Sequence, residues 1–234
     1  MKIVALVVAL FIALGALFSA CGNGQPAPEQ PTLPLLSLTD IASQANQAMA
    51  SAESLHFELE HNKGFTYIAM DIQMEKLVAD VLRPDRMRGF ISGTYSNAYF
   101  KNMELIIVGD AGYVKIFRWF PFETTVSPLG FLDTIGAILD NITDLKGLAN
   151  QERGGVLCYH LSGEVNAEHL RAFVGDDITQ NTVSIELWIG GQDFLVRQVD
   201  ISGKLTNREA SGITRTIKLS NYGQQLSIEP PQIG

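Results

Sequence analysis

The sequence predicts an α+β fold built on a strongly curved antiparallel sheet of about eleven strands. Short segments that alternate apolar and polar residues recur along the chain with short links, which is typical of strands that pair with their sequence neighbours. An open twisted sheet rarely exceeds ~10 strands, so a sheet of this length must curl or close. Amphipathic helical segments interrupt the order of strands, and the concave side of the sheet is the natural place for them.

The elements are predicted from periodicity and turn signals. Helices are expected at residues 38–52, 131–148 and 166–174. Strands are expected at residues 55–60, 66–75, 77–83, 86–93, 100–108, 112–118, 155–163, 182–189, 194–201, 213–219 and 225–228. Turn residues indicate tight connections at 84–85, 109–112 and 190–193.

The stretch from Phe117 to Leu148 is the centre of the prediction. An aromatic run at 117–122 leads through a loop at 124–128 into apolar residues at helical spacing, with Gly147 as a candidate stop. The plain interpretation is a helix that covers one face of the sheet. The alternative is a lid and wall over a cavity that holds an apolar molecule.

The beginning of the chain has the pattern of a secretory signal. Lys2 precedes an uncharged run over residues 3–20. Small residues directly before Cys21 resemble a bacterial lipobox, in which the cysteine is acylated and becomes the new N-terminus, although Phe18 stands where that pattern usually has leucine. We therefore expect residues 1–20 to be a lipoprotein signal peptide and Cys21 to be a lipid anchor. An ordinary cleaved signal with an incidental cysteine is the alternative.

A tether is expected to follow the anchor. Residues 22–34 contain four prolines, few apolar residues and no periodicity. We expect the acylated N-terminus and its tether to occupy residues 21–36 and one domain to occupy 37–234, because a chain of roughly this length can bury a sizeable core.

Composition excludes some classes of partner. The chain carries 17 Lys and Arg against 25 Asp and Glu, a formal net charge of −8. A chain this acidic argues against nucleic acid, whose binding depends on neutralising phosphates. It also argues against a broad electrostatic contact with anionic lipid.

No catalytic motif is found. The sequence has no G-x-S-x-G, H-E-x-x-H, C-x-x-C or phosphate-loop pattern, so we expect no metal site, no cofactor and no enzymatic activity. Cys158 and His160 would share a face of one strand, but no third group completes a catalytic set. Cys158 is therefore expected to act as a small buried apolar residue.

Six segments together carry a resemblance to a known family; they span residues 48–57, 82–89, 108–114, 154–165, 187–199 and 219–231. In order and spacing they resemble the LppX/LprG-type lipid-binding lipoproteins, which are related in architecture to the lipoprotein carrier LolA. The resemblance implies a half-barrel whose concave-side helices enclose an apolar cavity for acyl chains. The aromatic run at 119–122 and the strand at 66–75 depart from the family pattern, which leaves the identity of the lipid open.

The resemblance also implies a function, that of a membrane-anchored lipoprotein which carries a lipid or glycolipid within the cell envelope. Its partners would be that ligand, the membrane through N-terminal acylation at the extracytoplasmic face, and an export pump or envelope acceptor. The side chains expected to line the cavity are Phe57, Leu59, Leu105, Ile107, Phe117, Phe131, Ile135, Leu139 and Ile142. A structural or interaction lipoprotein of the same fold without lipid cargo is the alternative function.

Overall fold

The structure, a computed structural model, describes residues 33–68, 72–123, 130–174 and 177–233. These residues belong to one compact unit of the chain, which begins at Leu33. The predicted signal peptide, Cys21 and most of the predicted tether lie outside the described residues, so they stay predictions.

The unit contains twelve described strands and three described α-helices. The helices are α1 (Leu38–Ser51), α2 (Gly130–Asn141) and α3 (Arg171–Val174), and the short 3-10 helix η2 (Ala167–Leu170) leads into α3. The strands are β1 (Ser54–His61), β2 (Thr66–Ile68), β3 (Ile72–Leu82), β4 (Arg86–Tyr95), β5 (Ala98–Val108), β6 (Ala111–Lys115), β7 (Trp119–Glu123), β8 (Thr143–Arg153), β9 (Val156–Asn166), β10 (Thr182–Gly190), β11 (Val196–Ser202) and β12 (Thr214–Ser220).

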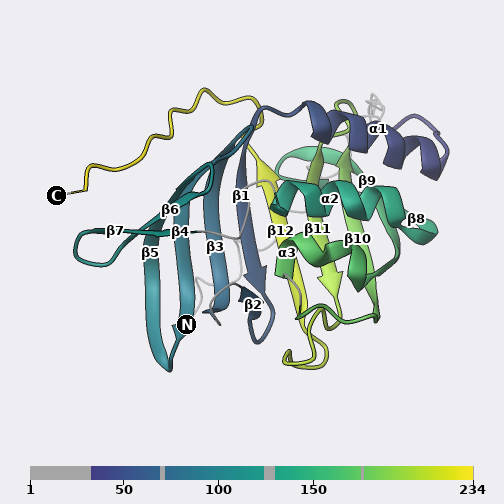
Figure 1. The fold of residues 1–234 in the computed structure, drawn as a ribbon. Coiled ribbons are helices and arrows are strands. Elements are labelled where there is room, and N and C mark those ends of the chain that lie inside the picture. Colours follow the sequence, from purple (N-terminus) through teal and green to yellow (C-terminus); the bar gives the residue numbers. More distant parts are fainter. Residues whose placement is uncertain (1–32, 69–71, 124–129, 175–176, 234) are drawn as a thin grey trace, which may run out of the picture. The chain divides into compact units, whose positions relative to one another are not determined.

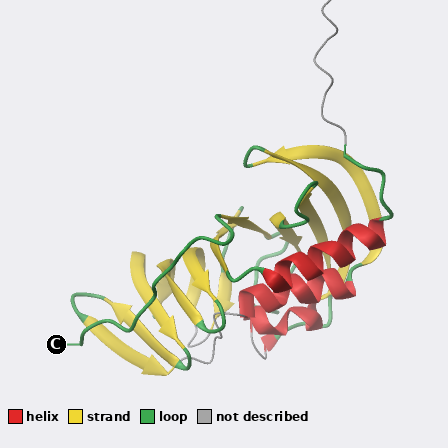
Figure 2. Ribbon diagram, turned by 90° about the horizontal axis from the view of Figure 1, so that it is seen from above, coloured by secondary structure: helices red, strands yellow, loops and turns green. Residues whose placement is uncertain are grey.

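All described strand pairs are antiparallel and belong to one sheet. Its order is β7-β6-β5-β4-β3-β1-β12-β11-β10-β9-β8, with β2 paired to β3 beside this path. Within the described strands, β7 and β8 are the two ends of the order, so the sheet is not closed. Figures 1 and 2 show the sheet curving, with the helices together on its inner face over the half that holds β8–β12.

Cross-strand pairing aligns apolar side chains on this inner face. One row crosses eight strands in direct register; its members are Met103, Ile91, Leu77, Leu59, Ile217, Val199, Leu187 and Leu161. The neighbouring row runs through Phe120, Val114, Leu105, Gly89, Ala79, Phe57 and Leu219. Because side chains alternate between the faces of a strand, the polar residues between these rows lie on the outer face.

The helices form because their apolar residues fall on one side. Helix α1 is capped by Ser37, whose hydroxyl oxygen accepts a hydrogen bond from the Asp40 amide at 3.1 Å. Helix α1 buries Ile41, Ala45 and Met49 in the core that it shares with α2 and the inner face of the sheet. The predicted curved antiparallel sheet with helices on its concave face is therefore confirmed, whereas the enclosed apolar cavity stays a prediction.

The predicted helix at 131–148 is too long by about two turns. Helix α2 ends at Asn141, and β8 begins at Thr143. Asp144 has a φ of 50°, which an α-helix does not accept, so the chain turns here and pairs with β9 instead. Leu145 and Leu148 continue the helical spacing by coincidence, and the expected stop Gly147 lies within β8.

The predicted strands at 66–75 and 77–83 are wrong in their division. Residues 72–82 form the single strand β3, and only 66–68 form β2; residues 69–71 lie outside the description. The register shifts between Met74 and Lys76, and a bulge of this kind changes which alternate residues of the strand face inward. The change in the apolar–polar alternation therefore marks a bulge within one strand and not a break between two strands.

Two further predictions differ from the structure. Residues 119–123, for which no strand is predicted, form β7, while the expected loop at 124–128 lies outside the described residues. Residues 225–228 form no strand, because side chains bind this segment: Ser54 Oγ donates to Gln224 O at 2.6 Å, and Arg86 donates to Ile228 O at 2.7 Å.

Across the described part of the chain, helices are too short or too polar to cross a membrane.

Candidate functional site

Helix α2 turns its apolar side toward the core, as its spacing predicts. Ile135 is fully buried, Leu139 is nearly so, and Ile142, directly after the helix, packs partly buried against the same core. Phe131 belongs to α2, but its side chain lies outside the description. On the polar side, Asn46 of α1 donates a hydrogen bond to the Asp140 carboxylate, which ties the two helices together.

The predicted strand residues share the inner face. Phe57 and Leu59 of β1 are fully buried, Ile107 of β5 is almost completely buried, and Leu105 of β5 is partly exposed. Phe57 and Leu105 lie in one row, joined through Ala79 and Gly89. The face assignment of these four residues is therefore correct, and they form a continuous apolar surface with α2.

Phe117 lies elsewhere. Strand β6 ends at Lys115, and Phe117 occupies the turn before β7 with 80% of its surface exposed. Because it is mostly exposed, Phe117 does not join the other predicted residues in the core. Its ring makes an edge-to-face contact with Phe120, with centroids 5.2 Å apart.

The two halves of the inner face differ in burial. Over β9–β12 the inward side chains are sealed beneath the helices; Leu161, Leu187, Val199 and Ile217 are at most 1% exposed. Strands β4–β7, which we call the β4–β7 lobe, are not contacted extensively by any described helix. Six inward apolar side chains of this lobe are only partly buried: Phe100, Met103, Leu105, Val114, Phe120 and Phe122.

Strand β7 adds two aromatic rings to this surface. Phe122 pairs directly with Gly112, and Phe120 with Val114, so both rings face inward. A Cβ at position 112 would lie 2.4 Å from Phe122 Cζ, which shows that the ring lies across the glycine. Gly112 thus leaves the space that lets an edge-strand aromatic fold over the inner face.

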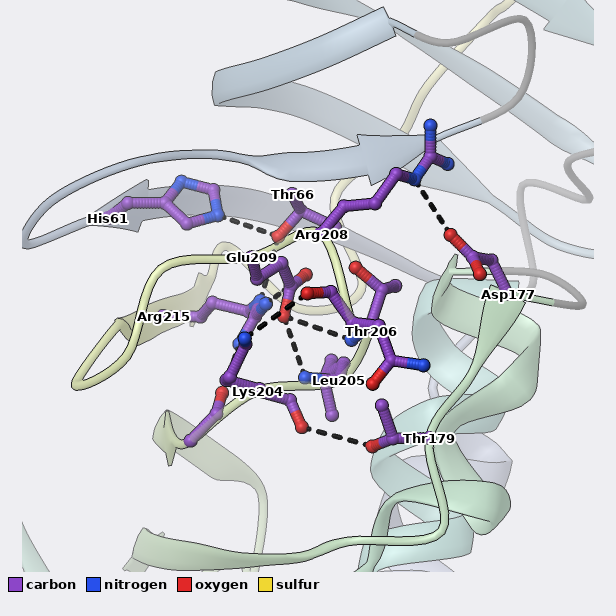
Figure 3. A network of polar contacts seen from close by, with 12 residues as sticks. His61, Thr66, Asp177, Thr179, Lys204, Leu205, Thr206, Arg208, Glu209 and Arg215 are labelled. Atoms are coloured by element: carbon purple, nitrogen blue, oxygen red, sulfur yellow. Dashed lines mark hydrogen bonds and ion pairs between the residues drawn. The ribbon is translucent and has the colours of Figure 1, made fainter.

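A buried polar network closes one end of the core (Figure 3). Glu209 and Arg215 form an ion pair and are both completely buried. Glu209 Oε2 accepts from the amides of Leu205 and Thr206 at 2.6 and 3.2 Å. Arg215 Nε donates to Thr66 Oγ1 at 2.7 Å, and Nη1 donates to Gly203 O at 3.0 Å. The network attaches the β11–β12 loop to β2.

His61 extends this network, and its hydrogen bonds suit the neutral ring. Its Nδ1 donates to Glu75 O at 2.7 Å, since a carbonyl oxygen only accepts. Its Nε2 lies 2.8 Å from the Thr66 hydroxyl, which accepts from Arg215 Nε and has its own hydrogen to donate to the ring. Burial lowers the pKa of His61, and the nearby positive charge of Arg215 lowers it further.

The residues considered for catalysis are held in other contacts. Burial raises the pKa of the Cys158 thiol, which donates to Val156 O. His160 Nε2 lies 2.8 Å from Glu186 Oε2, and its ring stacks on Trp188. No group of three or more His, Cys, Asp or Glu residues suited to a metal ion occurs within the described ranges. The arrangement offers apolar contact and no visible bond-breaking chemistry.

Sequence reasoning missed Phe120 and Phe122 because it predicts no strand over residues 119–123. The alternation of Trp119 and Pro121 with these two phenylalanines is the strand signal that could have found them. Glu209 and Arg215 were also missed, since nothing in their local sequence distinguishes a buried pair from two solvated charges.

A comparison with protein families decides the relationship. The model of the LppX_LprAFG lipoproteins matches residues 38–228, which is nearly the whole described unit. The chain belongs to this family. No curated protein matches the sequence of this LppX_LprAFG lipoprotein.

Solved structures of two LppX_LprAFG proteins share its fold. LprF from Mycobacterium bovis superposes with a TM-score of 0.70 at 17% identity, over 87% of this chain and 100% of that one. LppX from Mycobacterium tuberculosis superposes with a TM-score of 0.62 at 15% identity, over 82% of this chain and 98% of that one. At these identities the likeness concerns the fold alone.

Proposed function

We propose that this LppX_LprAFG lipoprotein binds the acyl chains of a lipid or glycolipid on the inner face of the β4–β7 lobe and carries that lipid within the cell envelope. The observation that carries the proposal is the set of partly buried apolar side chains there, continuous with the sealed core. Acyl chains would cover this surface without burying polar groups that lack a hydrogen-bond partner.

The predicted wall residues keep a place in this proposal. Phe57, Leu59, Ile107, Ile135 and Leu139 are buried, so we propose that they and the partly buried Ile142 support the site from the core behind it, while Leu105 lies where the sealed core meets the partly exposed surface. Phe131 is proposed as a further wall residue from its position in α2. We add five residues of the lobe whose apolar side chains are only partly buried: Phe100, Met103, Val114, Phe120 and Phe122.

Lipid extraction from purified protein tests the proposal. We expect bound lipid in the parent, detected by mass spectrometry. Leu105→Trp should displace it while the melting temperature stays near that of the parent, since the added ring takes space that the ligand used. Phe90→Trp is the matched control, because Phe90 lies on the outer face of the adjacent strand. The proposed site would be contradicted if the parent carried no lipid, or if the Leu105→Trp variant kept its lipid.

The anchor is a separate proposal. The family relationship and the small residues before Cys21 support acylation at that cysteine, at the extracytoplasmic face of the membrane. Two acyl chains suffice for stable attachment, each buried methylene contributing about 0.8 kcal/mol. Cys21→Ala should therefore release the protein from membranes or leave it unprocessed. A processed Cys21→Ala protein that remains in the membrane fraction would end this proposal.

A further inference from the structure

The turn between β6 and β7 exposes two adjacent large apolar side chains. Ile116 is 68% exposed and Phe117 is 80% exposed. Neither is needed for the described core, because both lie beyond the end of β6. Tyr95 and Tyr99, both more than half exposed, lie at the β4–β5 turn. Strand β6 pairs with β5 only as far as Glu104–Lys115, so the β6–β7 turn leaves the sheet well short of the β4–β5 turn (Figure 1).

Cationic side chains surround this apolar tip. Lys115 and Arg118 flank the two apolar residues in sequence, and Lys101 is exposed on the neighbouring strand β5. The single acidic residue within 95–104 and 113–119 is Glu104, which is mostly buried and pairs with Arg88 and Lys115. On a chain with a net charge of −8, this end is locally positive.

Aromatic rings join the apolar tip to its cations. Lys115 Nζ lies 5.5 Å from the centre of the Trp119 ring, and the Arg118 guanidinium lies 5.0 Å from that of Phe120. Trp and Tyr prefer the boundary between lipid headgroups and acyl chains, and Lys and Arg are attracted to anionic headgroups. This turn thus brings together exposed apolar side chains, aromatic rings and cations, the three kinds of group that a bilayer surface attracts.

We propose that this end of the β4–β7 lobe, through Ile116 and Phe117, docks on a bilayer that contains anionic phospholipid. The two apolar side chains enter the acyl boundary, and Lys101, Lys115 and Arg118 face the phosphates. The acidic remainder of the chain is repelled by the same surface, which orients the lobe tip first. This docking is distinct from N-terminal acylation and does not depend on the ligand proposed above.

Tryptophan fluorescence of the chain itself serves as the probe for the test. It has two tryptophans; Trp119 lies beside the tip, whereas Trp188 is 3% exposed and contacts His160 and Arg153. The full chain is added to phosphatidylglycerol–phosphatidylcholine vesicles whose acyl chains carry bromine, a quencher of tryptophan fluorescence. We expect quenching of Trp119, which Trp119→Phe abolishes and Trp188→Phe leaves intact.

Variants assign the contact. Phe117→Ser should weaken the vesicle dependence of quenching by roughly tenfold, because the transfer of one phenyl ring is lost. Arg118→Gln should weaken it by about fivefold on vesicles with phosphatidylglycerol and much less on pure phosphatidylcholine. Phe90→Ser is the matched control: it removes an exposed phenyl ring from the outer face of the same lobe and should leave the quenching unchanged.

Several results would overturn the docking proposal. Trp119 could stay unquenched while the protein sediments with vesicles, or quenching could survive in the Ile116→Ser/Phe117→Ser double variant. Self-association that Phe117→Ser removes, without any quenching, would assign the tip to a protein contact and also overturn it. A protein that carries no extractable lipid but shows quenched Trp119 would retain the docking and contradict only the ligand proposal.

Discussion

Strands β9–β12 and the β4–β7 lobe belong to one sheet and share one inner face, yet they bury it to different degrees. Leu161 and Leu105 are both inward-facing leucines, but helices seal the first and leave the second partly exposed. The strand alternation is the same in both halves, so it determines which side chains face inward and not whether they are covered. Coverage comes from the helices, all of which lie over one half of the sheet.

This difference separates stability from binding. The helix-covered half has fully buried side chains and a buried ion pair, which leaves no apolar surface for a ligand. The β4–β7 lobe keeps apolar area available and ends in the exposed turn of Ile116 and Phe117. Four predictions test whether the two halves differ in this way, from the largest expected effect to the smallest.

Breaking the buried ion pair should have the largest effect. Glu209→Gln leaves the charge of Arg215 buried without its partner, and we expect the free energy of unfolding to fall by about 3–5 kcal/mol in urea titrations. Asp177→Asn is the control, since the Asp177–Arg208 pair is exposed and should contribute at most about 1 kcal/mol. Equal stability of Glu209→Gln and the parent would show that the pair does not close the helix-covered half.

Truncation of inward leucines compares the halves directly. Leu161→Ala should lower the free energy of unfolding by about 2–5 kcal/mol, because the sealed core cannot refill the space. Leu105→Ala should lower it by only about 1 kcal/mol, since part of that side chain is already exposed. Similar losses in lipid-free samples of both variants would contradict the difference in burial.

Added methyl groups give a smaller contrast. A Cβ at Gly163 would lie 2.6 Å from Ile142 Cγ1 and 2.7 Å from Thr143 O, so Gly163→Ala should cost about 1–3 kcal/mol of stability. A Cβ at Gly112 meets only the far edge of the Phe122 ring, which can swing away. Thermal unfolding of Gly112→Ala should therefore remain closer to the parent, and the reverse order would refute the looser packing of the lobe.

The smallest effect concerns pH. His61 is partly buried, and burial lowers its pKa in the folded protein below the ordinary value of 6.5. As pH falls through 6.5, the unfolded chain binds a proton that the folded protein does not, and stability falls until the lowered pKa is reached. His61→Gln should flatten this part of the stability profile. An unchanged slope in urea titrations from pH 7 downward would show that His61 is not the responsible group.

The pairing of strands with their sequence neighbours and the inward residues of β1 and β5 follow from the sequence, whereas the β1–β12 pairing that joins the two runs of strands does not. Alternation is a local property, so Phe57, Leu59, Leu105 and Ile107 are assigned to the correct face without knowledge of their neighbours. Sequence limits the cap of α1 to the polar residues at its start, because capping depends on residues within one turn, and in the structure Ser37 is the cap.

The tertiary structure decided the features that depend on long-range partners. Leu145 and Leu148 fit a helix by spacing, but pairing with β9 makes them part of a strand. Phe117 and Phe122 look alike in one aromatic run, yet a turn exposes the first and the pairing with Gly112 brings the second inward. Local sequence also does not predict that the charge of Arg215 is buried, or which half of the sheet the helices cover. Local periodicity specifies faces, whereas burial is a property of what packs against them.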